Sequence, residues 1–214
     1  MLTMLALAAA TVLQPVTVRV HAARDIPRPL VTATLAEASA IWRTAGVTFA
    51  WDIVDDAPVH DISVSRDIRV NDAGRAPSLP TLCVTIDSAG GPARGPGMAI
   101  GWILFDPAGV PNRDIHLSFA NAMELIQSVD GTVLSRMTIM EVRTLLARTL
   151  GRALAHELGH YFLASKEHAP SGLMKARRTA SEFSGPSRSG FEIEPELRNR
   201  VAARLNPAGS LARR

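Results

Sequence analysis

The sequence has few of the residues that several common classes of protein need. Its 214 residues include one cysteine, Cys83, which excludes a disulfide within the chain and a cysteine-rich metal site. Lysine occurs only at Lys166 and Lys175, and aromatic residues make up only 5% of the chain. The basic residues, nearly all arginine, are scattered until the C-terminal tail, and few aromatics lie among them. We therefore expect no nucleic-acid partner, because such proteins combine basic clusters with aromatics that stack on bases.

Size and composition still predict a folded core. Hydrophobic residues make up 47% of the sequence and charged residues 20%. A chain of this length and composition forms one domain, or one domain with a cleft between two lobes.

Residues 1–15 are apolar and contain no lysine or arginine. The small residues Ala6, Ala8, Ala9 and Ala10 are typical of the end of a secretory signal peptide, although no basic residue precedes them. The stretch is shorter than the ~20 residues needed to cross a bilayer, so we expect no transmembrane anchor. We predict a secreted or periplasmic protein. The alternative is a cytoplasmic protein in which this stretch forms a buried first strand.

Apolar residues repeat with the period of strands in several short stretches and with the period of a helix in one. The helical stretch covers 28–46 and ends at Gly46. The predicted strands are 16–22, 47–54, 61–70, 81–87, 98–105 and 114–119, with loops rich in glycine and proline at 88–97 and 106–113. This order predicts an α+β fold with a mixed, twisted sheet of four or five strands and a backing helix.

A second, longer helix is predicted from Thr138 to about residue 164. Thr138 and Glu141 have the spacing of a capping box, in which each side chain accepts a hydrogen bond from the backbone of the other residue. No proline interrupts Met140–Phe162, and the two glycines within that stretch weaken a helix without ending it. The chain is thus expected to form an N-terminal lobe at 16–164 and a short C-terminal lobe at 165–214 that includes a terminal helix.

The hexapeptide AHELGH, residues 155–160, lies in the second half of this helix. At about 100° and 1.5 Å per residue, His156 and His160 lie one turn apart on one face, so both imidazoles can reach one ion. Glu157 points beside that ion, where a base acting on a metal-bound water is needed. Chance alone would produce the pattern roughly 0.007 times in such a chain. The alternative is a pair of core histidines, which would bury the Glu157 carboxylate without a counter-charge.

A catalytic zinc site needs three protein ligands and one open position. His168 follows His160 by eight residues, and on a continued helix it would lie about 12 Å further along, out of reach of the same ion. Pro170 and Gly172 predict that the chain leaves the helix and turns back. From the residues alone the third ligand is His168, or else Glu167 or a later carboxylate.

The stretches HELGHYFLASKEH and SGLM resemble the metzincin clan of zinc metallopeptidases, in a divergent bacterial group with a longer spacer. The usual clan pattern is His-Glu-x-x-His-x-x-Gly-x-x-His, followed by a methionine-containing turn below the metal. Here Leu163 replaces the glycine, Lys166 replaces the third histidine, and His168 comes two residues later.

The resemblance implies a zincin-like fold, with Met174 in the turn below the metal. It also implies one catalytic Zn²⁺, bound by His156, His160 and His168. In the related gluzincins a glutamate from a following helix is the third ligand, and the candidates for that arrangement are Glu182, Glu192, Glu194 and Glu196.

This resemblance predicts a zinc-dependent endopeptidase that acts on a peptide or protein substrate. A metal-activated water attacks the peptide carbonyl, while Glu157 accepts its proton as general base and passes it to the leaving nitrogen. The single tyrosine, Tyr161, is expected to face away from the metal, so the candidates for stabilising the oxyanion are His116, Lys175 and Arg177. The alternative is a non-catalytic binding or structural protein that keeps the zinc site, although a structural zinc has no use for Glu157.

The substrate is expected to lie extended along an edge strand of the sheet, above the metal-binding helix. The resemblance assigns this role to residues 98–105, with the residues Met98, Ile100, Gly101 and Ile103. The glycine would let a peptide backbone approach closely. The alternative is an interior strand, because the stretch is apolar on both faces.

Overall fold

The structure, a computed structural model, describes residues 15–54, 81–91, 99–128 and 134–205. The apolar stretch 1–15 lies almost entirely outside these residues, and so do the strand predicted at 61–70 and Met98. No helix among the described residues is long and apolar enough to span a membrane.

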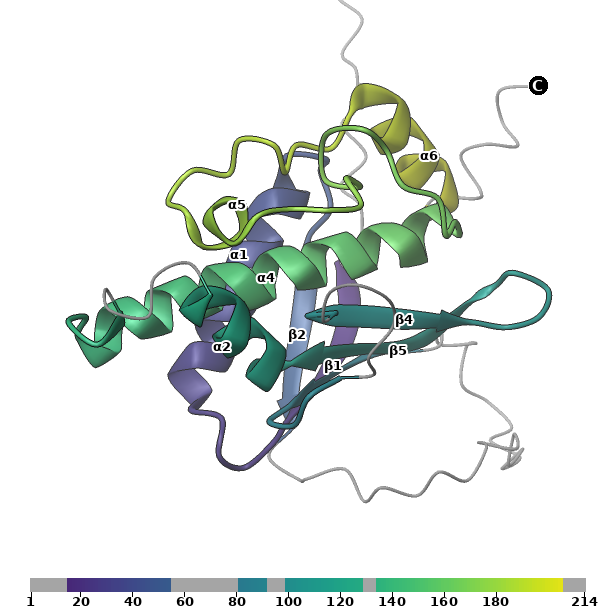
Figure 1. Cartoon of the computed structure of the whole chain (residues 1–214). Coiled ribbons are helices and arrows are strands. Elements are labelled where there is room, and N and C mark those ends of the chain that lie inside the picture. The colour runs from purple at the N-terminus through teal and green to yellow at the C-terminus, as the bar shows by residue number, and fades with distance from the viewer. Residues whose placement is uncertain (1–14, 55–80, 92–98, 129–133, 206–214) are drawn as a thin grey trace, which may run out of the picture.

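A mixed sheet of five strands forms the base of the described structure (Figure 1). The strands are β1 (Val16–Ala22), β2 (Phe49–Val54), β3 (Leu82–Asp87), β4 (Gly101–Phe105) and β5 (Pro111–Ser118). They are arranged in the order β2-β1-β3-β5-β4, and every neighbouring pair is parallel except β4 with β5. The expected mixed sheet and α+β class are confirmed.

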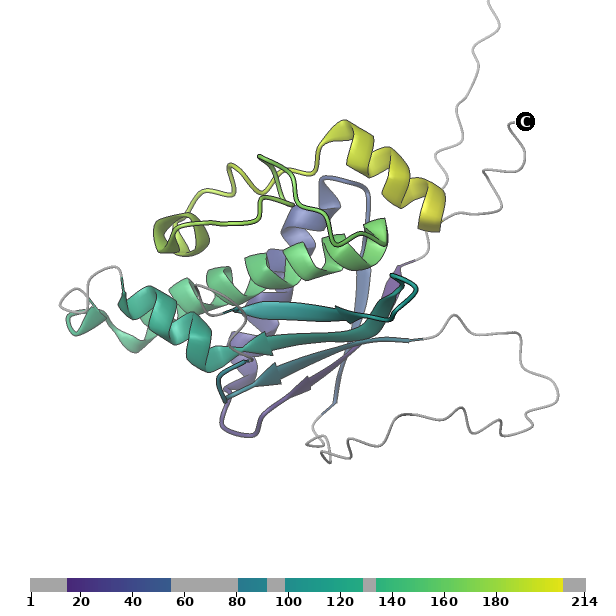
Figure 2. The same cartoon turned by 45° about the vertical axis from the view of Figure 1, so that its right-hand side comes forward.

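The helices are α1 (Arg28–Arg43), α2 (Phe119–Gln127), α4 (Ile139–Leu163), α5 (Ala180–Ser184) and α6 (Pro195–Leu205). They gather on one side of the sheet, where α1 is the expected backing helix and α4 runs across it (Figure 2). Strand residues facing this side, such as Val18, Val84 and Ile115, are fully buried. Alternation along the strands therefore buries one face of the sheet under α1 and α4.

Helix α4 begins as the sequence predicts. The Thr138 side chain accepts from the backbone N–H of Glu141, and the Glu141 carboxylate accepts from the backbone of Thr138 at 2.7 Å. The helix is held against α1 by Trp42, whose indole N–H donates to the Ala155 carbonyl at 3.1 Å and whose ring contacts Phe162 edge-on. These contacts fix the second half of α4, which carries AHELGH, above the sheet.

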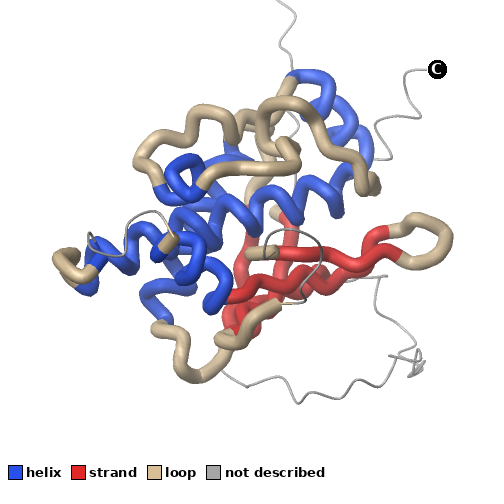
Figure 3. The backbone as a smooth tube through the Cα atoms, in the orientation of Figure 1, coloured by secondary structure: helices blue, strands red, loops and turns tan. Residues whose placement is uncertain are grey.

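Several elements differ from the sequence-based expectation, among them β4, which begins at Gly101 and not at residue 98. Helix α2 was not predicted; it begins where the Ser118 hydroxyl accepts from the backbone N–H of Asn121, at the end of β5. Strand β5 begins at Pro111, three residues before the predicted start, because a proline is tolerated at the first position of a strand. The segment between α4 and α6 is mostly loop, with α5 its only helix (Figure 3).

Candidate metal centre

Three imidazoles converge at the C-terminal half of α4. Each of His156, His160 and His168 offers one ring nitrogen, and these atoms all lie within 4.8 Å of one another. The Nε2 atoms of His156 and His160 are 3.1 Å apart. In the described part of the chain this is the one group of histidine, cysteine or acidic side chains that could hold a metal ion.

The two helical imidazoles are oriented by backbone carbonyls. His156 Nδ1 lies 2.9 Å from the Leu173 carbonyl, and His160 Nδ1 lies 2.7 Å from the Ser165 carbonyl. Because a carbonyl oxygen can only accept, each Nδ1 carries the hydrogen and each Nε2 keeps a free lone pair. Burial lowers the pKa of His156 to about 4 and also lowers that of His160, so both rings are neutral at pH 7. Neutral imidazoles with lone pairs aimed at one point suit Zn²⁺.

A turn directly after α4 brings His168 back to the helix. Ala164 closes α4 with φ +47°, the left-handed conformation that usually requires glycine. The following N–H, of Ser165, donates to the carbonyl of His160 at 3.3 Å. The turn that glycine builds in the usual pattern is therefore built here by an alanine, one residue after Leu163.

Met174 packs on α4 at Gly159, which lies between His156 and His160 in the sequence. A Cβ placed on Gly159 would collide with the Met174 sulfur, so the glycine leaves room for this side chain against the helix. Met174 is 3% exposed, and its carbonyl accepts from the Ala169 N–H at 2.9 Å. The preceding carbonyl, of Leu173, is the one that orients His156. The turn at 172–174 therefore both supports the helix and positions a candidate ligand.

Glu157 is buried between α4 and the edge of the sheet. Desolvation raises the pKa of its carboxyl to about 8, while the backbone N–H of Ile103, which donates to it, acts in the opposite direction. A Cβ on Gly101 would lie 3.1 Å from the Glu157 Cγ, so the glycine leaves the space that this side chain fills. The carboxyl thus sits beside the imidazoles and directly against strand β4.

Strand β4 is an edge strand within the described residues, because it ends the strand order and pairs only with β5. The Ser118 N–H donates to the Ile100 carbonyl at 2.8 Å, so Ile100 faces β5. Since successive residues of an antiparallel strand alternate in direction, Gly101 and Ile103 turn their backbone groups to the open edge.

A cleft of about 1010 Å³ lies between this edge, α4 and the segment after Met174. Ile100, Gly101 and Ile103 line it, as do Lys175 and Arg177. His116 does not; it stacks on Trp102, and its Nδ1 lies 4.0 Å from Asp87.

The carboxylates considered as a third ligand lie in other contacts. Glu182 accepts from Lys175 Nζ at 2.8 Å, Glu192 accepts from the Gly190 N–H, and Glu194 accepts from the hydroxyl of Ser171. None of them, nor Glu167 or Glu196, belongs to the group of possible metal ligands. His168 is the side chain that joins the two helical histidines.

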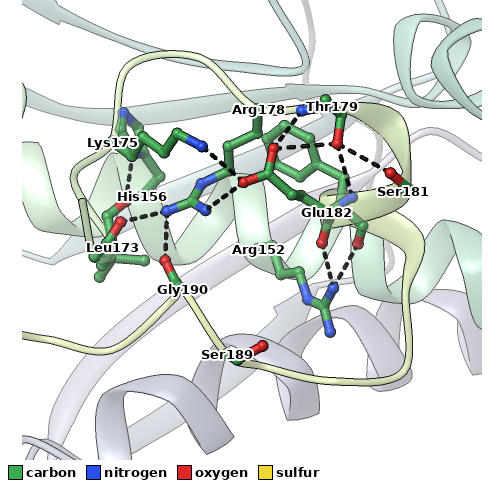
Figure 4. A network of polar contacts seen from close by, with 12 residues as sticks. Arg152, His156, Leu173, Lys175, Arg178, Thr179, Ser181, Glu182, Ser189 and Gly190 are labelled. Atoms are coloured by element: carbon green, nitrogen blue, oxygen red, sulfur yellow. Dashed lines mark hydrogen bonds and ion pairs between the residues drawn. The ribbon is translucent and has the colours of Figure 1, made fainter. Parts of the chain in front are cut away.

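Two arginines that no sequence motif singles out donate hydrogen bonds to the backbone of the segment 172–190, beside the site (Figure 4). Arg152, one turn before His156 on α4, is fully buried and donates to the carbonyls of Glu182, Phe183 and Ser187. Arg178 donates to the carbonyls of Gly172 and Gly190. Its guanidinium also lies 3.9 Å from the centre of the Phe191 ring. A charged residue within the buried stretch TLGRALA was the available signal for Arg152.

No protein-family model matches the sequence, and no curated protein matches it either. Solved structures do match the fold. An archaemetzincin from Methanopyrus kandleri is 16% identical, with a TM-score of 0.52 over 90% of this chain and 96% of its own. A zinc-dependent peptidase from Methanocorpusculum labreanum is 13% identical, with a TM-score of 0.53 over 86% of this chain and 99% of its own. The fold is that of a metzincin-like zincin.

Proposed function

We propose that this metzincin-like protein is a zinc-dependent endopeptidase with Glu157 as its general base. The observation that carries the proposal is the convergence of three imidazoles beside a buried carboxyl in an open cleft. His156 and His160 are neutral at pH 7, and backbone carbonyls already orient both rings. Such a donor set matches that of a catalytic zinc with one open position.

His156, His160 and His168 would hold the ion. Bound there, zinc supplies Lewis acidity that activates a water and polarises a carbonyl. The positive charge of the bound ion would favour the ionised form of Glu157, which could then take the proton of the attacking water and deliver it to the leaving nitrogen. The peptide bond would break without a covalent intermediate. The Ile103 N–H that donates to Glu157 keeps the carboxyl at the position from which it acts.

We propose that the peptide lies along β4. Gly101 directs both of its backbone groups, and Ile103 its carbonyl, to the open edge, so an extended chain can pair there and present a carbonyl at the metal. Because the Ile103 N–H already donates to Glu157, the strand that would bind the substrate also positions the base.

A non-catalytic zinc protein is the competing function, and the Glu157→Gln variant separates the two. It keeps the shape of the side chain and removes the base, so zinc content should stay near one ion per chain while hydrolysis of a mixed peptide library falls at least roughly a hundredfold. Zinc is measured by elemental mass spectrometry and cleavage by peptide mass spectrometry. Chelation followed by zinc add-back is the control for a contaminating protease. Equal hydrolysis by both proteins would remove the role of Glu157, and no hydrolysis by either would favour the non-catalytic function.

A further inference from the structure

The charged side chains that line the cleft are almost all of one sign. Glu157, the proposed base, is the only acidic residue among those of the described chain that line it. Four basic residues line the same cleft: Lys166, Lys175, Arg177 and Arg178. Both lysines of the sequence therefore line the cleft together with Arg177 and Arg178, whereas the remaining arginines of the described chain do not.

The basic residues lie at two ends of the cleft. Lys166 belongs to the turn after α4, and its Nζ lies 5.1 Å from the centre of the Phe105 ring at the end of β4. Arg177 is exposed on the segment after Met174 and makes no ion pair with the residues that the structure describes. Lys166 is exposed too, with Glu167 next to it in the sequence.

Two of the basic residues at the second end contact the same carboxylate. Lys175 Nζ lies 2.8 Å from Glu182, and the Arg178 guanidinium lies 3.8 Å from the same side chain (Figure 4). Glu192 also acts on Arg178, so two carboxylates balance Lys175 and Arg178, and the charge of Arg177 leaves this side of the cleft positive. The hydrogen bond from Lys175, followed by that from the Thr179 backbone, lowers the pKa of Glu182 to about 2, as expected in cationic surroundings.

Arg178 is fixed next to the turn that orients His156. It donates to the carbonyls of Gly172 and Gly190, and the carbonyl of Leu173, beside Gly172, contacts His156. An anionic group bound in the cleft would therefore meet fixed positive charge on the approach to the scissile position, and a cationic group would be repelled.

From this arrangement we infer that the cleft selects acidic peptides, with aspartate or glutamate within a few residues of the scissile bond. The inference deepens the proposed function and rests on it. Lys166 would contact an acidic side chain at one end of the bound peptide. Arg177 and Lys175 would contact an acidic side chain at the opposite end. Peptides rich in lysine or arginine would be poor substrates.

The test uses peptides that differ at one position only. Glutamate, glutamine and lysine are placed in turn at each of three positions on either side of the bond that the wild-type protein cleaves. At 50 mM salt the glutamate peptide should be cleaved about fivefold faster than its glutamine partner at one or more positions, and the lysine peptide more slowly. The preference should shrink at 500 mM salt because the charges are exposed. Equal rates for glutamate and glutamine at every position would overturn the inference.

Variants then assign the preference to residues. Arg177→Gln and Lys166→Gln should each reduce the ratio of glutamate to glutamine rates to about twofold at the affected position. Arg43→Gln, which removes the same charge from the exposed end of α1, is the matched control and should leave the ratio unchanged. The ratio is the decisive quantity, because a residue that only stabilises the oxyanion would lower both rates equally. An unchanged ratio in both cleft variants would contradict the assignment.

A binding measurement separates this inference from the proposed function. The zinc-loaded Glu157→Gln protein is titrated with fluorescent glutamate and glutamine peptides and binding is followed by anisotropy. If wild-type protein cleaves no peptide, the endopeptidase proposal fails. The selection for acidic peptides then stands only if the glutamate peptide binds about fivefold more tightly. Equal binding of the two peptides overturns the selection whether or not the wild-type protein is a peptidase.

Discussion

The candidate metal centre lies where two regions meet, and different interactions stabilise each of them. Helix α4 supplies His156, Glu157 and His160 and packs through apolar side chains; Leu154 and Leu158 on it are fully buried. The segment 164–194 supplies His168 and Met174 but contains only the short helix α5 (Figure 3). In this segment, arginine side chains donate hydrogen bonds to backbone carbonyls. In a strand or helix, backbone N–H groups would make those hydrogen bonds.

The difference shows how an irregular segment can position a ligand. Arg152 and Arg178 donate to the carbonyls of five residues: Gly172, Glu182, Phe183, Ser187 and Gly190. The same two guanidinium groups lie over the Phe191 ring. Backbone carbonyls that have no strand or helix partner must find donors elsewhere, and a guanidinium with five N–H groups is the most efficient source.

The largest effect is expected from Arg152→Ala, which removes the side chain that connects helix α4 to the segment 164–194. Arg152 Nε lies 3.0 Å from Glu37, a carboxylate that is itself 7% exposed, and its loss also leaves three carbonyls without their donor. The free energy of unfolding should fall by about 3–5 kcal/mol, measured by urea titration. Arg143→Ala, a change at a partly exposed arginine of the same helix, is the control and should stay within about 0.5 kcal/mol. Similar midpoints for the two variants would contradict this account.

Next in size is His168→Ala, which tests whether the segment supplies the third ligand. Zinc affinity should fall at least about a hundredfold, since partners that only orient a ligand already contribute up to that factor. The metal-free His168→Ala protein should keep the wild-type stability, because the His168 side chain is exposed. His160→Ala should lower both the zinc affinity and the stability of the metal-free protein, because His160 is only 7% exposed. Competition with a chromogenic chelator measures the affinity. Retained zinc in His168→Ala, together with its loss in Glu194→Ala, would assign the ligand to the carboxylate.

Ala164→Gly should stabilise the protein, because the junction of the two regions uses a conformation that alanine disfavours. At φ +47° the left-handed conformation costs an alanine about 1–2 kcal/mol, and glycine would remove this cost. Glycine also gives the unfolded chain more conformational freedom, which offsets part of the gain. A net gain of about 0.5–1 kcal/mol is expected in thermal unfolding. Ala147→Gly, inside α4, should destabilise by at least about 1 kcal/mol. A loss of stability in both variants would show that Ala164 is not strained.

The smallest effect concerns the charges of the segment at acid pH. The pKa of Glu182 is about 2 when folded, against an ordinary value of 4.5, so its stabilising contribution is complete above pH 4.5. The contribution is lost as the pH falls from 4.5 toward 2. Because the side chain is partly exposed, the loss should be under about 1 kcal/mol. Glu182→Gln should flatten the pH dependence of stability in this window, and an unchanged slope would remove the role of its ion pairs.

The two regions also differ in how far the sequence predicts them. Helix α4 follows from neighbouring residues, because the capping box of Thr138 and Glu141 and the spacing of His156 and His160 are local patterns. The contact of Arg152 with Glu37 joins residues 115 positions apart, and no local pattern indicates it. The residues alone left the third ligand open between His168 and a carboxylate, because the approach of His168 depends on a left-handed alanine that sequence propensities disfavour.

The closeness of the three histidines in the chain has a thermodynamic consequence. All lie within residues 156–168, so bringing them to one ion closes a short loop. Loop entropy grows as (3/2)RT ln n, so a ligand as distant as Glu194 would require about 1.3 kcal/mol more. An unfolded chain can therefore also bind zinc through these imidazoles, and a metal that binds both states raises the melting temperature less than its affinity for the folded site implies. Zinc would then organise this stretch early, before the distant strands of the sheet have paired.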